Sequence, residues 1–170
     1  MRYEDGSGSF SHYSGAFLKR GLGGKKRLLY NLPEVIAADT VLIVEGEKKA
    51  DIVAALGLVD EAGKPVAITC TGSANSWRTE FVEHLIGKRV LILPDSDEAG
   101  RRYATSVQDS LSRAGIQYAA VDFSAYGNDV RDFIADHSSD DLREFIDSPW
   151  LGAPIEPTWP PEEDISVWLP

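Results

Sequence analysis

Two segments of the sequence place acidic residues directly after a short apolar stretch. Asp95 and Asp97 follow the apolar residues 90–93, and Glu45 follows the apolar residues 41–44. Short, unbroken apolar runs with β-branched members are typical of strands that are buried on both faces of a parallel sheet. Ligands of such sheets bind at the carboxyl ends of the strands. If the two strands are neighbours, the three carboxylates therefore converge at one edge of the sheet.

Carboxylates gathered in this way repel one another unless water solvates them fully or a cation lies between them. The segments contain no His or Cys, so their oxygen atoms suit Mg²⁺ or Mn²⁺ rather than Zn²⁺. The alternative is an acidic turn in which Asp97 caps a helix that begins at Glu98. Both interpretations end the strand at Pro94, which cannot donate a hydrogen bond to a neighbouring strand.

The rest of the sequence alternates apolar strand patterns with amphipathic helix patterns. Strands are expected at residues 40–44, 66–70, 89–93 and 116–121. Helices are expected at residues 47–57, 98–114 and 138–147, around residues 81–86, in a short segment with Pro33 in its first turn, and after a cap at Asp129. This alternation indicates an α/β fold with a parallel sheet of about four strands flanked by helices.

The Glu-Gly after the first strand and the Asp-x-Asp about fifty residues later resemble the Toprim domain. Bacterial-type primases, type IA and type II topoisomerases and OLD-type nucleases share this domain. The similarity extends over residues 39–135 and is greatest to the primase-like Toprim of phage and plasmid primase-helicases. It implies a Toprim, Rossmann-like fold. The segments that carry it are VEGEKKAD, residues 44–51, and LPDSDEAGR, residues 93–101.

The resemblance also implies roles for individual residues. It makes Glu45, Asp95 and Asp97 the catalytic residues, with Glu45 as general acid and base, and it makes all three ligands of Mg²⁺ or Mn²⁺. A further acidic loop of the family corresponds to Asp129 as an additional metal ligand, with Asp132 as the second choice. The alternative for this loop is an ordinary capped surface helix.

Basic residues follow both acidic segments. Lys48, Lys49 and Arg101 lie in the first turns after the loops, where they are expected to contact phosphates; the alternative is that they are simply solvated. One position departs from the resemblance. Several Toprim families have an acidic residue four positions after the glutamate, where this chain has Lys49, and this departure argues against a site with two metal ions.

These assignments predict metal-dependent phosphoryl transfer on nucleic acid. The reaction expected is RNA primer synthesis on a single-stranded DNA template from nucleoside triphosphates. The chain would then be part of a DNA replication protein of a phage or other mobile element. A replicative helicase is a further candidate partner. Two alternatives are a Toprim nuclease that cleaves DNA or RNA and a non-catalytic module that binds nucleic acid or a protein. Phosphatases and receiver domains also place Asp-x-Asp after a strand, but those phosphatases have Thr where this chain has Ala99.

Charge and composition divide the chain into three expected regions. Residues 1–38 form a basic N-terminal arm and lead-in, residues 39–147 the Toprim catalytic domain, and residues 148–170 a Pro- and Trp-rich tail. Residues 1–31 carry six basic and two acidic side chains, a net charge of +4. Because the whole chain has a net charge of −10, the remaining residues carry −14. The arm is expected to bind nucleic acid through Lys25, Lys26 and Arg27; the alternative is a solvated, flexible segment.

Smaller features complete the expectations. Phe10, Tyr13 and Phe17 are spaced for the edge of a short hairpin within the arm, which is otherwise expected to be extended or poorly ordered. Cys70 is the only cysteine, which excludes a disulfide within the chain and a Cys-rich zinc ribbon. The sequence shows neither a signal peptide nor an apolar run of membrane-spanning length, so a cytoplasmic protein without membrane contact is expected.

Overall fold

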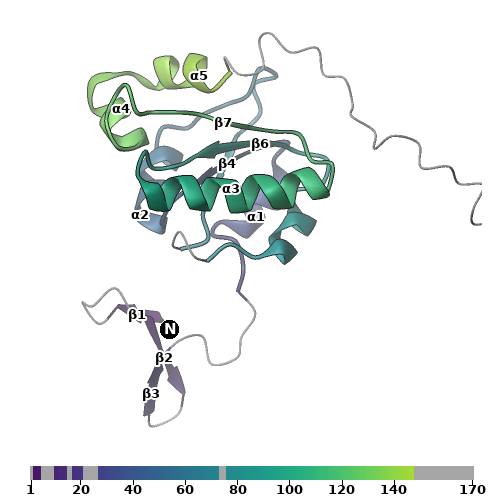
Figure 1. The fold of residues 1–170 in the computed structure, drawn as a ribbon, viewed down its shortest axis with the longest axis vertical. Coiled ribbons are helices and arrows are strands. Elements are labelled where there is room, and N and C mark those ends of the chain that lie inside the picture. Colours follow the sequence, from purple (N-terminus) through teal and green to yellow (C-terminus); the bar gives the residue numbers. More distant parts are fainter. Residues whose placement is uncertain (1, 5–9, 15–16, 21–26, 73–75, 148–170) are drawn as a thin grey trace, which may run out of the picture.

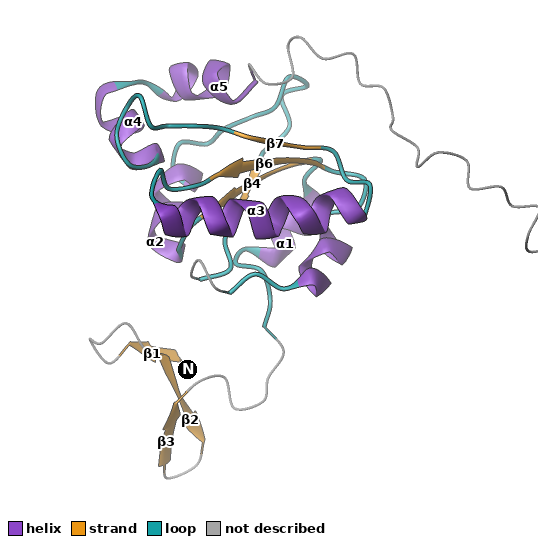
Figure 2. Cartoon of the chain, viewed as in Figure 1, coloured by secondary structure: helices purple, strands orange, loops and turns teal. Residues whose placement is uncertain are grey.

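The computed structural model describes residues 2–4, 10–14, 17–20, 27–72 and 76–147. Its central element is a parallel sheet of four strands in the order β5-β4-β6-β7. Figure 2 labels β4, β6 and β7 of this sheet. This sheet confirms the predicted α/β fold. The strands are β4 (Thr40–Val44), β5 (Ala67–Thr69), β6 (Arg89–Leu93) and β7 (Tyr118–Ala120).

The two central strands, β4 and β6, pair along their full length, from Thr40 opposite Arg89 to Val44 opposite Leu93. Successive side chains of a strand point to opposite faces, and both faces of this pair are buried. Val41, Ile43, Val90 and Ile92 belong to one core, and Leu42, Val44, Leu91 and Leu93 belong to the other. Burial on two sides explains why these strands are unbroken apolar runs.

Helices cover both faces of the sheet (Figure 1). The first core is closed by α1 (Leu32–Ala37), by the 3₁₀ helix η1 (Thr79–His84) and by α3 (Glu98–Arg113). The second core is closed by α2 (Glu47–Ala54), α4 (Val130–Asp136) and α5 (Ser139–Asp147). The chain therefore forms three layers, and each loop after β4 or β6 leads directly into a helix.

Element boundaries differ from the predictions at a few ends. The helix expected over residues 47–57 ends at Ala54, because the last turn tightens to hydrogen bonds from Leu56 N–H to Val53 O and from Gly57 N–H to Ala54 O. The helix expected around residues 81–86 is a 3₁₀ helix. Its three-residue turns bring Phe81, Val82 and Leu85 into the first core. The outer strands β5 and β7 are shorter than expected.

The N-terminal region contains a separate antiparallel sheet of β1 (Arg2–Glu4), β2 (Phe10–Ser14) and β3 (Phe17–Arg20). The β2–β3 hairpin, with Ser14 opposite Phe17, confirms the hairpin predicted there. Lys25, Lys26 and residues 148–170 lie outside the described part of the chain, and the division into three regions stays a prediction. Among the described residues, no helix is both long enough and apolar enough to cross a membrane.

Candidate functional site

The ends of β4 and β6 bring Glu45 and Asp95 into contact. Val44 pairs with Leu93, so Glu45 leaves β4 beside the point where the chain leaves β6 toward Asp95. The backbone N–H of Asp95 donates a hydrogen bond to the Glu45 carboxylate. The other notable feature of this carboxylate is its Oε1, which is buried and has no hydrogen-bond partner among the described residues. A buried acceptor of this kind needs a donor or a cation from beyond the described residues.

The surroundings of Glu45 raise the pKa of its carboxyl group above the usual value. Burial is the largest cause, and the negative charge of Asp95 adds to it, with a smaller contribution from Asp97. The Asp95 N–H and the Lys49 ammonium act in the opposite direction without reversing the shift. A carboxylate whose pKa is raised in this way is a better proton acceptor than an ordinary carboxylate.

Lys49, in the first turn of α2, points into the site. Only 6% of its side chain is exposed, and its ammonium contacts Oδ1 of Asp95 and lies 3.0 Å from Oδ2 of Asp129. The side chains of the two partners are 19% and 1% exposed. Lys49, which the sequence suggested as a phosphate contact, is thus held between two carboxylates of its own chain.

Asp129 is the most deeply buried carboxylate of the site. It caps α4, accepts a hydrogen bond from the backbone N–H of Arg131, and contacts the Arg131 guanidinium at 2.7 Å through Nη2. Burial alone would raise its pKa, but hydrogen bonds from Arg131 and Lys49 more than offset burial and lower the pKa to about 2. The Asp132 side chain completes the capping box of the same helix. Asp129 therefore stays ionised, paired with two cations.

Close backbone contacts fix the loop that carries Asp95. A Cβ atom at position 100 would lie 2.2 Å from the backbone oxygen of Asp95, so only Gly100 lets α3 begin this close to the loop. The Ser96 N–H donates to the Asn128 backbone oxygen at 2.6 Å, and the Arg101 guanidinium donates to the Ser96 backbone oxygen. The loops that carry Asp95 and Asp129 are therefore joined directly.

Asp97 caps α3: its Oδ1 accepts a hydrogen bond of 2.7 Å from the Gly100 N–H. The capping interpretation of the Asp-x-Asp segment is thus confirmed for this residue. The cap is compatible with a second role, because the residue is exposed and its charge acts on Glu45. An exposed carboxylate at a helix N-terminus can use its remaining oxygen for another ligand.

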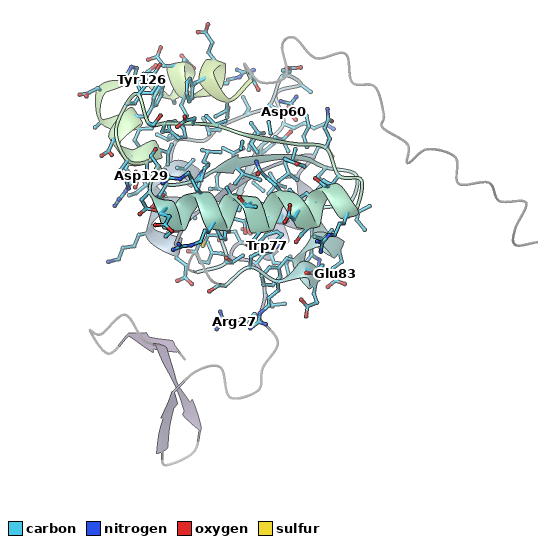
Figure 3. The ribbon with its side chains drawn as sticks, in the orientation of Figure 1. Arg27, Asp60, Trp77, Glu83, Tyr126 and Asp129 are labelled. Atoms are coloured by element: carbon cyan, nitrogen blue, oxygen red, sulfur yellow. The ribbon has the colours of Figure 1, made fainter. Side chains whose placement is uncertain are left out.

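The other basic residues suggested by the sequence lie in two places. Lys48 and Arg101 are exposed and lie in the first turns of α2 and α3, close in sequence to the acidic residues. Arg27 hydrogen-bonds to the Ser76 hydroxyl at 3.1 Å. Figure 3 shows Arg27 on a different side of the fold from Asp129. The end of the N-terminal arm therefore enters the domain away from the carboxylates.

The carboxylates at this edge of the sheet are the kind of donor that a divalent cation takes, but they do not form a complete metal site among the described residues. Oxygen ligands suit Mg²⁺ or Mn²⁺, and Glu45 offers an acceptor without a partner. In the part of the chain that the structure describes, however, no three acidic, His or Cys side chains form a ready metal cluster. Asp129 is already neutralised by Lys49 and Arg131. Among the predicted ligands, Glu45 and Asp95 are therefore the pair that the structure brings together, and the metal-binding role of Glu45, Asp95, Asp97 and Asp129 stays a prediction.

Sequence reasoning did not identify the internal position of Lys49, although the sequence contains a signal for it. Lys49 precedes Val53 by four residues, so both lie on one face of α2, and that face is buried together with Ala50. A lysine on the apolar face of a helix requires a buried acidic partner. Asp95 and Asp129 are those partners.

Comparison with known proteins agrees with this geometry. The family model described as Toprim-like matches residues 42–134, which is more than half of the chain. The matched segment runs from β4 into α4 and contains Glu45, Asp95, Asp97 and Asp129. No curated protein matches the chain.

Proposed function

The chain belongs to the Toprim-like family, and we propose on this basis that it carries out phosphoryl transfer on nucleic acid. Toprim domains take part in metal-dependent nucleic-acid processing and bind divalent metals such as Mg²⁺. The specific reaction that we propose is primase-type nucleotidyl transfer, in which a primer 3′-hydroxyl attacks a nucleoside triphosphate on a single-stranded DNA template. The observation that carries the proposal is the contact between Glu45 and Asp95 at adjoining ends of β4 and β6.

Each residue of the site has a role in this reaction. Glu45, Asp95 and Asp97 would hold Mg²⁺ or Mn²⁺, which when bound neutralises charge on the phosphate oxygens and acidifies the attacking hydroxyl. Glu45, with its raised pKa, accepts the proton that the hydroxyl loses. Lys48 and Arg101 are exposed in the first turns of α2 and α3, and in this proposal they contact the phosphates.

The partners proposed are a single-stranded DNA template, nucleoside triphosphates and a replicative helicase, in the replication of a phage or other mobile element. The +4 charge of residues 1–31 supports template binding by the arm, through Lys25, Lys26 and Arg27. Neutralising these three residues should weaken single-stranded DNA binding and reduce its dependence on salt. Equal affinity and equal salt dependence would remove the arm from the interface.

Glu45→Gln tests the proposed reaction, because glutamine keeps the shape of the side chain but cannot accept the proton. Purified protein would be incubated with single-stranded DNA, nucleoside triphosphates and Mg²⁺ or Mn²⁺, and the products separated on a denaturing gel. The rate of primer synthesis should be roughly 10²–10⁴-fold lower in the variant than in the parent. Glu80→Gln, an exposed change in η1, is the matched control and should retain activity.

The same gel separates the proposed reaction from the alternatives. Shortened template without primers would identify a nuclease at this site. DNA binding with neither product would identify a non-catalytic module. Equal primer synthesis by the parent and Glu45→Gln would contradict the assignment of Glu45 as proton acceptor.

A further inference from the structure

The Lys49 ammonium occupies the place between two carboxylates that a metal ion takes in an acidic site. Asp95 and Asp129 come from different loops, and their carboxylates meet at the same nitrogen atom. Two carboxylates that share one position repel each other unless a cation lies between them. Here the cation belongs to the chain.

Burial makes this arrangement different from a surface ion pair. Lys49 is 6% exposed and Asp129 is 1% exposed, so neither charge is stabilised by much water. Removing one partner of such a pair leaves the other as an unneutralised buried charge. The Arg131 guanidinium covers the other side of Asp129, which is therefore neutralised without any external ion.

The two sides of the site are consequently unequal. On one side, Lys49 closes the space between Asp95 and Asp129. On the other side, Oε1 of Glu45 is buried without a partner among the described residues, and Asp97 is exposed. When ionised, the four carboxylates and the two cations Lys49 and Arg131 leave a net charge of −2. One divalent cation neutralises this charge, whereas two would leave an excess of +2.

We propose that Lys49 is a built-in cation that takes the place of one divalent ion between Asp95 and Asp129, so that the site accepts a single divalent cation on the Glu45 side. The inference deepens the proposed function and rests on it for the divalent cation. Lys49 is a positioning residue in this account: it holds Asp95 against Asp129 before a divalent cation arrives. A solely structural lysine would be replaceable without any change in the number of ions bound.

Lys49→Met tests the inference, because methionine keeps much of the length and the apolar body of lysine but removes its charge. Mn²⁺ binding to the full chain would be measured by titration calorimetry and by counting free Mn²⁺ with electron paramagnetic resonance. The variant should bind one Mn²⁺ ion more per chain than the parent. Lys48→Met is the matched control, since Lys48 is the exposed neighbour in the same helical turn. This control and Lys49→Arg should bind the same number of ions as the parent.

A second variant locates the additional ion. Combining Lys49→Met with Asp129→Asn removes one of the two carboxylates but keeps a side chain that can cap α4. The additional ion should then be lost. If Lys49→Met is unfolded in buffer without divalent cations, addition of millimolar Mn²⁺ should restore its circular dichroism spectrum and its melting transition.

The outcomes distinguish this inference from the proposed function. A parent that binds no Mn²⁺ would contradict both the metal-dependent reaction and the single cation on the Glu45 side, whereas the gain of one ion in Lys49→Met would still support Lys49 as the cation between Asp95 and Asp129. Equal numbers of ions in the parent and Lys49→Met, or an unfolded Lys49→Met that Mn²⁺ does not restore, would overturn the inference about Lys49 and leave the proposed reaction untouched.

Discussion

The two ends of the parallel sheet each contain a lysine that contacts an aspartate, but the surroundings of the two pairs differ. At the amino end of β4, Lys64 lies 2.6 Å from Asp39, and the two side chains are 60% and 64% exposed. At the carboxyl end, Lys49 contacts Asp95 and Asp129 and is almost fully buried. Direct contact is common to both ends, whereas burial is confined to one.

Burial decides what each pair can do. Water and salt compete with the exposed pair, whose net contribution to stability is small. In the buried group each charge depends on its partners, so a change at one residue is felt at the others. The presence of a pocket does not identify the end with the buried charges. A polar pocket of about 480 Å³ lies at the amino end, where the ion pair is exposed, and is lined in part by Asp39, Lys88 and Arg89.

Asp129→Ala should produce the largest change of stability, because it removes a partner of Lys49 and the cap of α4 together. We expect the free energy of unfolding to fall by roughly 3–5 kcal/mol. Urea denaturation followed by circular dichroism at pH 7 would measure it. Asp39→Ala at the amino end is the matched comparison and should have a much smaller effect. Similar losses of unfolding free energy in Asp129→Ala and Asp39→Ala would show that burial does not decide how much each ion pair stabilises the fold.

Acid should weaken the buried contacts at the carboxyl end of the sheet more than the exposed pair at the amino end. The pKa of Asp129 is lowered from 3.8 to about 2 in the folded chain. A lowered pKa stabilises the fold fully above the unfolded value, and this stabilisation is lost as the pH falls from about 4 to about 2. The loss is on the order of 2 kcal/mol. Urea denaturation between pH 5 and pH 2 would measure it.

Asp129→Asn is the variant for this pH series, because asparagine caps a helix without titrating. Its unfolding free energy should depend less on pH below 4 than that of the parent. A parallel pH dependence in the two proteins would mean that other carboxyl groups, such as the exposed Asp141, dominate the acid response.

The sequence predicted the sheet well because its signals are local. Residues 40–44 and 89–93 form β4 and β6 as expected, since a strand buried on both faces must be apolar throughout. The meeting of Glu45 with Asp95 followed from the rule for parallel strands. The Lys49 contacts did not follow, because Asp129 lies eighty residues away and its loop is positioned by the Ser96–Asn128 hydrogen bond. The helical spacing of Lys49 and Val53 indicates a buried lysine, but no local pattern identifies the carboxylates that it contacts.

Asp97→Asn should produce the smallest change of stability and separates a cap from a metal ligand. The Asp97 oxygen that accepts the Gly100 N–H has an equivalent in the asparagine carbonyl, and the two residues cap helices about equally well. The free energy of unfolding without metal should therefore change by less than roughly 0.5 kcal/mol. The substitution also removes a negative charge that repels Glu45, so the stability without metal should be equal to that of the parent or slightly higher.

Mn²⁺ binding by Asp97→Asn should change in the opposite sense, because an amide oxygen carries no charge to attract the cation. Titration calorimetry should show weaker Mn²⁺ binding, and thermal melts should show a smaller shift on addition of Mn²⁺ than in the parent. Primer synthesis should fall further than affinity does, since a displaced cation no longer matches the transition state. A variant that binds Mn²⁺ and reacts like the parent would make Asp97 a helix cap alone, and would leave Glu45 and Asp95 as the carboxylates that receive the cation.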